Sequence, residues 1–111
     1  MKKLDPIRVL LVNVGGPGAP GTIRSLRAHA EREIMLVGID INPHVPTRAL
    51  LDVFEVSPRS DDVTFLSFIR DICKREKIDV ILPLSSLGIE LFEKIAKEPE
   101  MPAVIDRKSV V

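Results

Sequence analysis

Three glycines with the spacing G-x-G-x-x-G follow the first long apolar run of the chain, because Gly16, Gly18 and Gly21 come after residues 9–14. Between a buried strand and a helix, such glycines permit a sharp turn, close approach of a ligand to the backbone and close helix–strand packing. The start of the helix also presents unpaired N–H groups and a partial positive charge. The pattern therefore predicts a site for an anionic or strongly polar small molecule.

Polar residues after the next apolar run are further candidates for this site. Asp40 ends the run 34–40, at the position where a dinucleotide-binding domain uses an acid to accept hydrogen bonds from ribose hydroxyls. An equally open interpretation is that Asp40 caps the loop that follows. Arg48, in that loop, either meets a carboxylate or phosphate in the crevice or pairs with a local acid on the surface.

A third group of candidates follows the apolar run 79–83. Ser85 and Ser86 are primarily candidates for capping the helix that follows. Glu90 is either a site acid or the partner of Lys94, four residues further on, and the second interpretation is favoured. The sequence has no recognisable Ser-His-Asp set, pair of catalytic carboxylates or Walker lysine. It therefore predicts half of a binding site and no reaction centre.

Composition limits the classes of function. Lys and Arg together number 16, as do Asp and Glu, and this balance does not support binding to nucleic acid or to a membrane surface. The apolar runs have the length of strands, and the N-terminus has no signal-peptide pattern, so we expect a cytoplasmic protein without a membrane span. The single cysteine, Cys73, is expected to be a buried structural thiol. The two histidines lack the spacing of metal ligands.

Apolar runs predict strands at residues 8–14, 34–40, 79–83 and 103–105, and alternating polar and apolar residues predict a short edge strand at residues 52–56. Helices are predicted from the glycine turn to about residue 30, from residues 60–62 to about 76, and after residue 85 or 86. The alternation indicates an α/β fold, a three-layer Rossmann-like parallel sheet of about five strands in the order 3-2-1-4-5. Ligands bind such sheets at the carboxyl ends of the strands beside the reversal. The glycine turn, Asp40 with Asn42, and residues 83–88 converge there.

Four segments, in order, resemble a known family: V-G-G-P-G-A-P-G-T-I-R-S-L-R, V-G-I-D-I-N-P, D-V-F-E-V-S-P-R-S-D-D and I-C-K-R-E-K-I-D-V-I-L-P-L. They are similar to the N-terminal, pre-ATP-grasp domain of ATP-grasp ligases, with the closest likeness to carbamoyl-phosphate synthase large-subunit-like proteins. The resemblance extends from about residue 8 to residue 96.

The resemblance implies a Rossmann-like domain that precedes a larger ATP-binding region. In such enzymes the later domains hold ATP and magnesium, and the N-terminal domain lines the side where the carboxylate or amine substrate binds. The positions that the resemblance assigns to loop N–H groups are Gly15, Gly16 and Gly18, and those that it assigns to polar contacts are Asp40, Asn42 and Glu90. Relatives often place acids where this chain has Ser86 and Gly88, which weakens the case for an inherited substrate site.

Our leading hypothesis is that residues 1–111 are one domain, the non-catalytic substrate-side domain of an ATP-grasp carboxylate–amine or carboxylate–ammonia ligase. The ATP-grasp region is expected after residue 111, in the same chain or in a separate subunit, and the chain itself is a fragment, a split-gene subunit or a stand-alone domain. No cofactor is expected on this domain alone, and a homodimer is possible. The alternative is a nucleotide- or NAD-binding module that uses Gly16, Gly18, Gly21 and Asp40.

Overall fold

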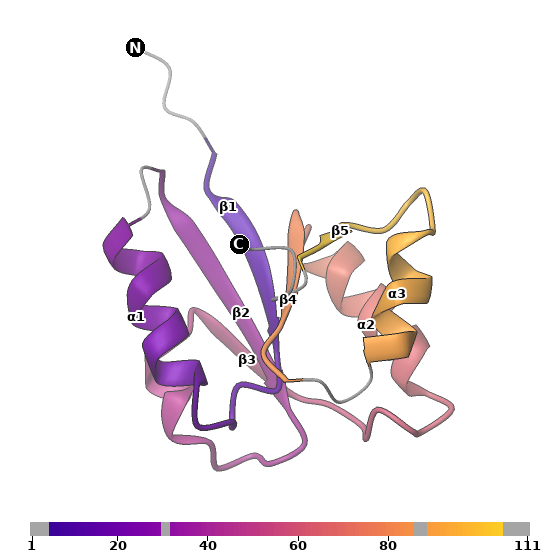
Figure 1. Cartoon of the computed structure of the whole chain (residues 1–111), viewed down its shortest axis with the longest axis horizontal. Coiled ribbons are helices and arrows are strands. Elements are labelled where there is room, and N and C mark those ends of the chain that lie inside the picture. Colours follow the sequence, from indigo (N-terminus) through magenta and orange to yellow (C-terminus); the bar gives the residue numbers. More distant parts are fainter. Residues whose placement is uncertain (1–4, 30–31, 86–88, 106–111) are drawn as a thin grey trace.

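A computed structural model of the chain describes residues 5–29, 32–85 and 89–105. Within these residues five parallel strands form one sheet in the order β3-β2-β1-β4-β5 (Figure 1). This confirms the predicted α/β fold and strand order. The strands are β1 (Ile7–Val12), β2 (Ile34–Asp40), β3 (Val53–Val56), β4 (Val80–Pro83) and β5 (Ala103–Val104).

The helices lie on the two faces of the sheet, as the three-layer prediction requires (Figure 1). They are α1 (Ala19–His29), the 3₁₀ helix η1 (Pro46–Leu50), α2 (Phe65–Arg75) and α3 (Ile89–Ala96). Apolar side chains of β1 and β2 pack alternately towards the two faces, because successive residues of a strand point in opposite directions. One core, which includes Leu10, Ile39 and Ile81, packs against α2 and α3. The other, which includes Leu11 and Leu36, packs against α1.

Two predicted boundaries are wrong for local reasons. The first strand ends at Val12 rather than at residue 14, because Asn13 has a φ of 69° and turns the chain out of the sheet. The second long helix begins at Phe65 rather than at residues 60–62. There the Asp62 carboxylate accepts hydrogen bonds from the Thr64 amide (2.8 Å) and the Thr64 hydroxyl (2.6 Å). These bonds close a turn that delays the start of the helix. Both hydrogen bonds lower the pKa of Asp62, and the bond from the Thr64 hydroxyl has the larger effect.

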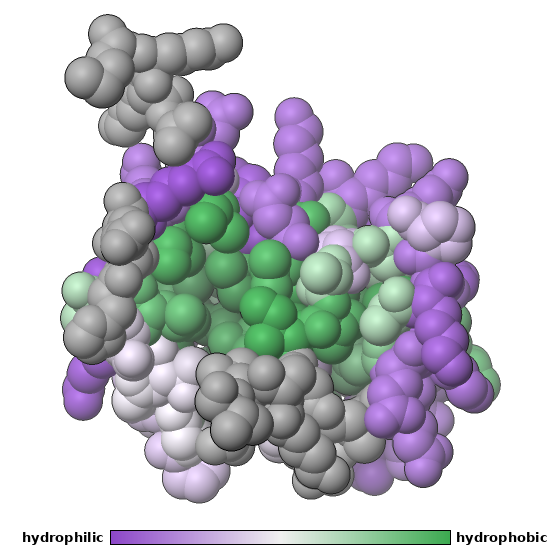
Figure 2. Space-filling model, turned by 45° about the horizontal axis from the view of Figure 1, so that its top comes forward, coloured by the Kyte–Doolittle hydropathy of each residue, from purple (hydrophilic) through white to green (hydrophobic). Residues whose placement is uncertain are grey.

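One part of the sheet carries no helix in the described residues. On the α1 face, the core that packs against α1 contains buried residues of β1 and β2, and Leu82 of β4 is partly buried against it. Ile81 is fully buried against α2 and α3, whereas its neighbours Val80 and Leu82, which point to the α1 face, are only partly buried. Figure 2 shows a continuous apolar area in the middle of the molecule, bordered by hydrophilic residues.

Candidate functional site

The glycine turn between β1 and α1 is held by its own hydrogen bonds and by one carboxylate. The Gly15 amide donates to Asp40 Oδ2 at 2.7 Å. The Gly16 amide donates to the Asn13 carbonyl at 3.2 Å, and the Ala19 amide donates to the Gly16 carbonyl at 3.1 Å. The turn is therefore a rigid platform whose conformation depends on a residue 25 positions away.

The carboxylate of Asp40 connects two loops of the site by hydrogen bonds. The residue is only 9% exposed. Its Oδ2 accepts from the Gly15 amide, and its Oδ1 accepts from the Asn42 amide at 2.9 Å. Both oxygens of the carboxylate thus bind backbone N–H groups of two loops. These are the contacts of the loop-capping interpretation of Asp40, and a ribose would have to compete with them.

Few amides of the turn remain to bind a phosphate. Among residues 15–21, all of which the structure describes, Gly15, Gly16 and Ala19 donate their N–H groups within the protein. Positions 17 and 20 are prolines, which have no N–H group. A phosphate cradle needs several converging free amides, and this turn offers at most those of Gly18 and Gly21.

An open cleft of about 870 Å³ lies at the carboxyl ends of the strands. Its volume is within the usual range for a small-molecule site, which is about 300–1,000 Å³. It is located where β1 lies between β2 and β4, beside the reversal of strand order, as the predicted topology requires. The lining residues come from four segments: Asn13, Gly15, Gly16 and Pro17; Asp40, Ile41, Asn42, Val45 and Pro46; Arg59, Ser60 and Asp61; and Ser85.

Five of the predicted site residues line this cleft: Gly15, Gly16, Asp40, Asn42 and Ser85. The Ser85 hydroxyl accepts a hydrogen bond from Asn13 Nδ2 at 2.8 Å, so two strand ends are joined across the base of the site. Ser86 lies outside the described residues. Glu90 is exposed in the first turn of α3 and is not among the lining residues.

Three other predicted residues lie away from the lining. The guanidinium carbon of Arg48 is 5.3 Å from the centre of the Phe54 ring, a cation–π contact on the η1 side of the sheet. Gly18 and Gly21 have open space where a Cβ would be, with no atom within 4 Å. The prediction that Gly21 permits close packing of helix on strand is therefore wrong. Among the glycines of this turn, Gly15 is the one with no room for a side chain, because a Cβ there would lie 2.8 Å from Asp40 Oδ2.

Sequence reasoning missed four polar residues of the cleft: Asn13, Arg59, Ser60 and Asp61. A signal for Asn13 was available, since asparagine between a buried strand and two glycines suits a left-handed turn. The other three follow β3, whose carboxyl end faces the same edge of the sheet as those of β1 and β2. Arg59 Nε and Asp61 Oδ1 are 3.2 Å apart, and their side chains are 76% and 71% exposed.

The lining of the cleft includes two carboxylates. Magnesium prefers oxygen ligands from carboxylates and water. Both carboxylate oxygens of Asp40 already accept hydrogen bonds from backbone amides, and the second carboxylate of the lining belongs to Asp61. In the described part of the chain, no group of three His, Cys, Asp or Glu side chains could hold a metal ion. Cys73 is buried in α2, outside the cleft lining, and burial raises the pKa of its thiol to about 12. Its thiolate is therefore scarce at neutral pH.

The strand order and the position of the cleft define a Rossmann-like domain with an open cleft at the strand ends. A family model described as "PylC-like, N-terminal domain" matches residues 18–105. The chain belongs to this family, whose members are the pre-ATP-grasp domains of ATP-grasp ligases. The family implies an ATP-grasp partner domain in cis. No curated protein matches the chain significantly. Among the helices of the described ranges, none has the length and apolarity needed to cross a membrane.

Proposed function

We propose that this domain forms the substrate side of an ATP-grasp ligase that joins a carboxylate to an amine or to ammonia. The cleft at the ends of β1, β2 and β4 is the observation that carries the proposal. In ligases of this class ATP converts the carboxylate to an acyl phosphate, and the amine then displaces phosphate from it. The residues of this chain bind and orient the organic substrate, while a partner ATP-grasp domain holds ATP and magnesium.

The hydrogen bonds within the glycine turn support these separate roles of the two domains. Because amides of the turn donate hydrogen bonds within the protein, the turn presents a fixed surface to a substrate and leaves few N–H donors for a nucleotide. The same contacts weigh against the NAD-binding alternative, because they occupy both the pyrophosphate donors and the ribose acceptor of such a site. Carbamoyl-phosphate synthase-like specificity stays a prediction from the likeness of the four segments.

The partly uncovered sheet face gives the partner domain a surface to contact. Val80 and Leu82 of β4 are only partly buried, and Figure 2 shows a continuous apolar area on the molecule. Burial of apolar surface is the main driving force for association, so we propose that the ATP-grasp domain packs on this face.

The proposal is tested by measuring ADP release with the ATP-grasp domain of the same protein or complex. The chain alone should release no ADP from Mg²⁺-ATP, and the two parts together should release ADP only when a carboxylate substrate is present. Ser60→Trp, which fills the cleft, should lower kcat/KM at least about tenfold, equivalent to about 1.4 kcal/mol of transition-state binding. Ser67→Trp, on the exposed side of α2, is the matched control. ADP release by the chain alone, or a Ser60→Trp variant as active as its control, would contradict the proposal.

A further inference from the structure

Three charged residues line the cleft, and two of them are available to a ligand. Asp40 is buried, and its carboxylate is bound by the amides of Gly15 and Asn42. Arg59 and Asp61, by contrast, belong to the turn after β3 and are mostly exposed. The charge that a ligand meets in this cleft is therefore one guanidinium beside one carboxylate.

The two side chains form a pair that a ligand can open. Arg59 Nε lies 3.2 Å from Asp61 Oδ1, and Arg59 Nη2 lies 3.3 Å from Asp61 Oδ2. Ion pairs as exposed as this one contribute little to stability. The backbone beneath the pair is held independently, because the Asp62 amide donates to the Arg59 carbonyl at 3.0 Å. Opening the pair thus leaves the turn in place.

We infer that Arg59 and Asp61 select the ligand of this cleft by charge, admitting a small molecule that carries both an anionic and a cationic group. Its anionic group binds Arg59, its cationic group binds Asp61, and its apolar part lies against Ile41 and Val45. The inference rests on the proposed function, which makes the cleft a substrate site.

Electrostatics explains why a singly charged ligand is rejected. An anion that takes Arg59 from its partner comes close to the carboxylate of Asp61, which repels it. A cation that takes Asp61 meets the guanidinium in the same way. A molecule with both charges replaces the internal pair with two new pairs and leaves neither side chain beside a like charge.

The test is a nuclear magnetic resonance titration of the ¹⁵N-labelled chain with three probes of similar apolar size: norleucine, hexanoate and pentylamine. We expect norleucine to cause saturable shifts at the amides of Gly16, Ser60 and Asp61. Hexanoate and pentylamine should need at least about tenfold higher concentrations for the same shifts. Equal binding of the three probes, or no shift with norleucine up to its solubility limit, overturns the inference.

Charge-removing variants separate selection by charge from a merely structural role. Asp61→Asn should weaken norleucine binding about tenfold and strengthen hexanoate binding, because the repelling carboxylate is gone. Arg59→Gln should weaken norleucine similarly and strengthen pentylamine. Arg24→Gln and Asp71→Asn, exposed residues of α1 and α2 outside the lining, should leave all three affinities unchanged. A loss of binding for every probe in both cleft variants would contradict charge selection.

Failure of this inference and failure of the proposed function have different signatures. If the three probes bind alike while Ser60→Trp still lowers kcat/KM for substrate-dependent ADP release, the cleft is the substrate site and charge selection is wrong. If the probes and variants behave as expected but the cleft variant leaves ligase activity intact, the proposed function is wrong.

Discussion

At the scale of single residues, the contact between Gly15 and Asp40 determines the shape of the site. The carboxylate binds the Gly15 amide at 2.7 Å, and Val45 Cγ1 would lie only 3.0 Å from a Cβ at position 15. Neither neighbour can easily move, because Asp40 is held by two amides and Val45 is 4% exposed. Position 15 therefore requires glycine, because a Cβ there would lie too close to Asp40 and Val45.

Gly15→Ala is therefore expected to lower the free energy of unfolding by about 1–3 kcal/mol, the usual cost of overpacking. Gly18→Ala, three residues away in the same turn, should change it by less than about 0.5 kcal/mol because its surroundings are open. Urea unfolding of both variants measures the difference. Equal stabilities would show that the turn adapts to a side chain at position 15.

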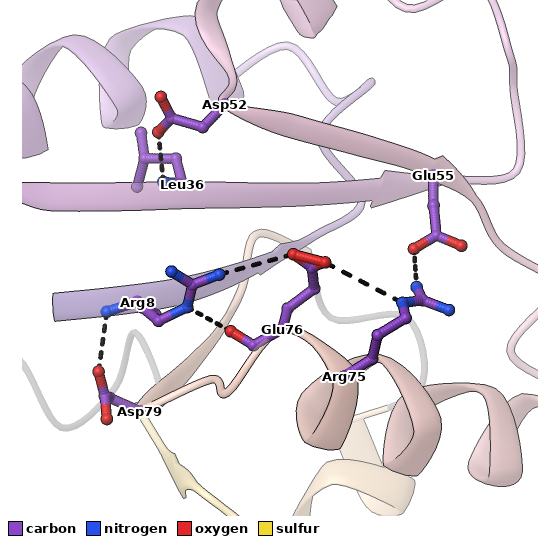
Figure 3. Close-up of polar contacts among 7 residues, drawn as sticks. All are labelled: Arg8, Leu36, Asp52, Glu55, Arg75, Glu76 and Asp79. Atoms are coloured by element: carbon purple, nitrogen blue, oxygen red, sulfur yellow. Dashed lines mark hydrogen bonds and ion pairs between the residues drawn. The ribbon is translucent and has the colours of Figure 1, made fainter. Parts of the chain in front are cut away.

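At the scale of elements, polar contacts tie the end of α2 to the sheet (Figure 3). Arg8 of β1 binds the backbone carbonyl of Glu76 and pairs with its carboxylate, with 3.6 Å between Nη2 and Oε1. Arg75 pairs with the same carboxylate and with Glu55 of β3. The Glu76 side chain is 19% exposed, so these pairs are partly shielded from solvent.

Glu76→Gln should lower the free energy of unfolding by about 1 kcal/mol, because it removes the charge shared by Arg8 and Arg75. Part of the difference should disappear at 1 M salt, where the screening length falls to about 3 Å. Urea unfolding at low and high salt checks this. Glu93→Gln, an exposed change on α3, is the control, and a salt-independent loss would assign the effect to packing instead.

At the scale of the whole molecule, the two faces of the sheet are covered unequally. α2 and α3 pack on one face, whereas on the α1 face Val80 and Leu82 of β4 are only partly buried. Figure 2 shows a continuous apolar area on the molecule. Ile105, just past β5, is 39% exposed. Large contiguous apolar patches on a domain are typical of interaction surfaces.

The double change Val80→Thr and Ile105→Thr should reduce the fluorescence of a dye that binds apolar surfaces, because it places two hydroxyl groups in the apolar area. The stability cost should be about 1 kcal/mol. Val63→Thr is the control, since Val63 is 95% exposed at an isolated position before α2. If the control lowers the fluorescence as much as the double change, the dye does not report on this face.

Local periodicity in the amino-acid sequence is enough to predict the type and order of the elements. Residues 34–40, an apolar run that ends at Asp40, form β2 with the predicted bounds. The predicted start of α2 is too early, because the capping residue Asp62 closes a preceding turn instead. Alternation of strands with helices, together with right-handed crossovers, then leaves few possible strand orders.

The contacts of the candidate residues depend on segments that the fold brings together. Asp40 meets Gly15 across 25 positions, and Asn13 meets Ser85 across 72. Arg59 joins the same cleft from the turn after the edge strand. Such contacts depend on strand register and on which loops share one edge of the sheet. Local residue patterns do not contain this information, because it arises from the pairing of distant segments.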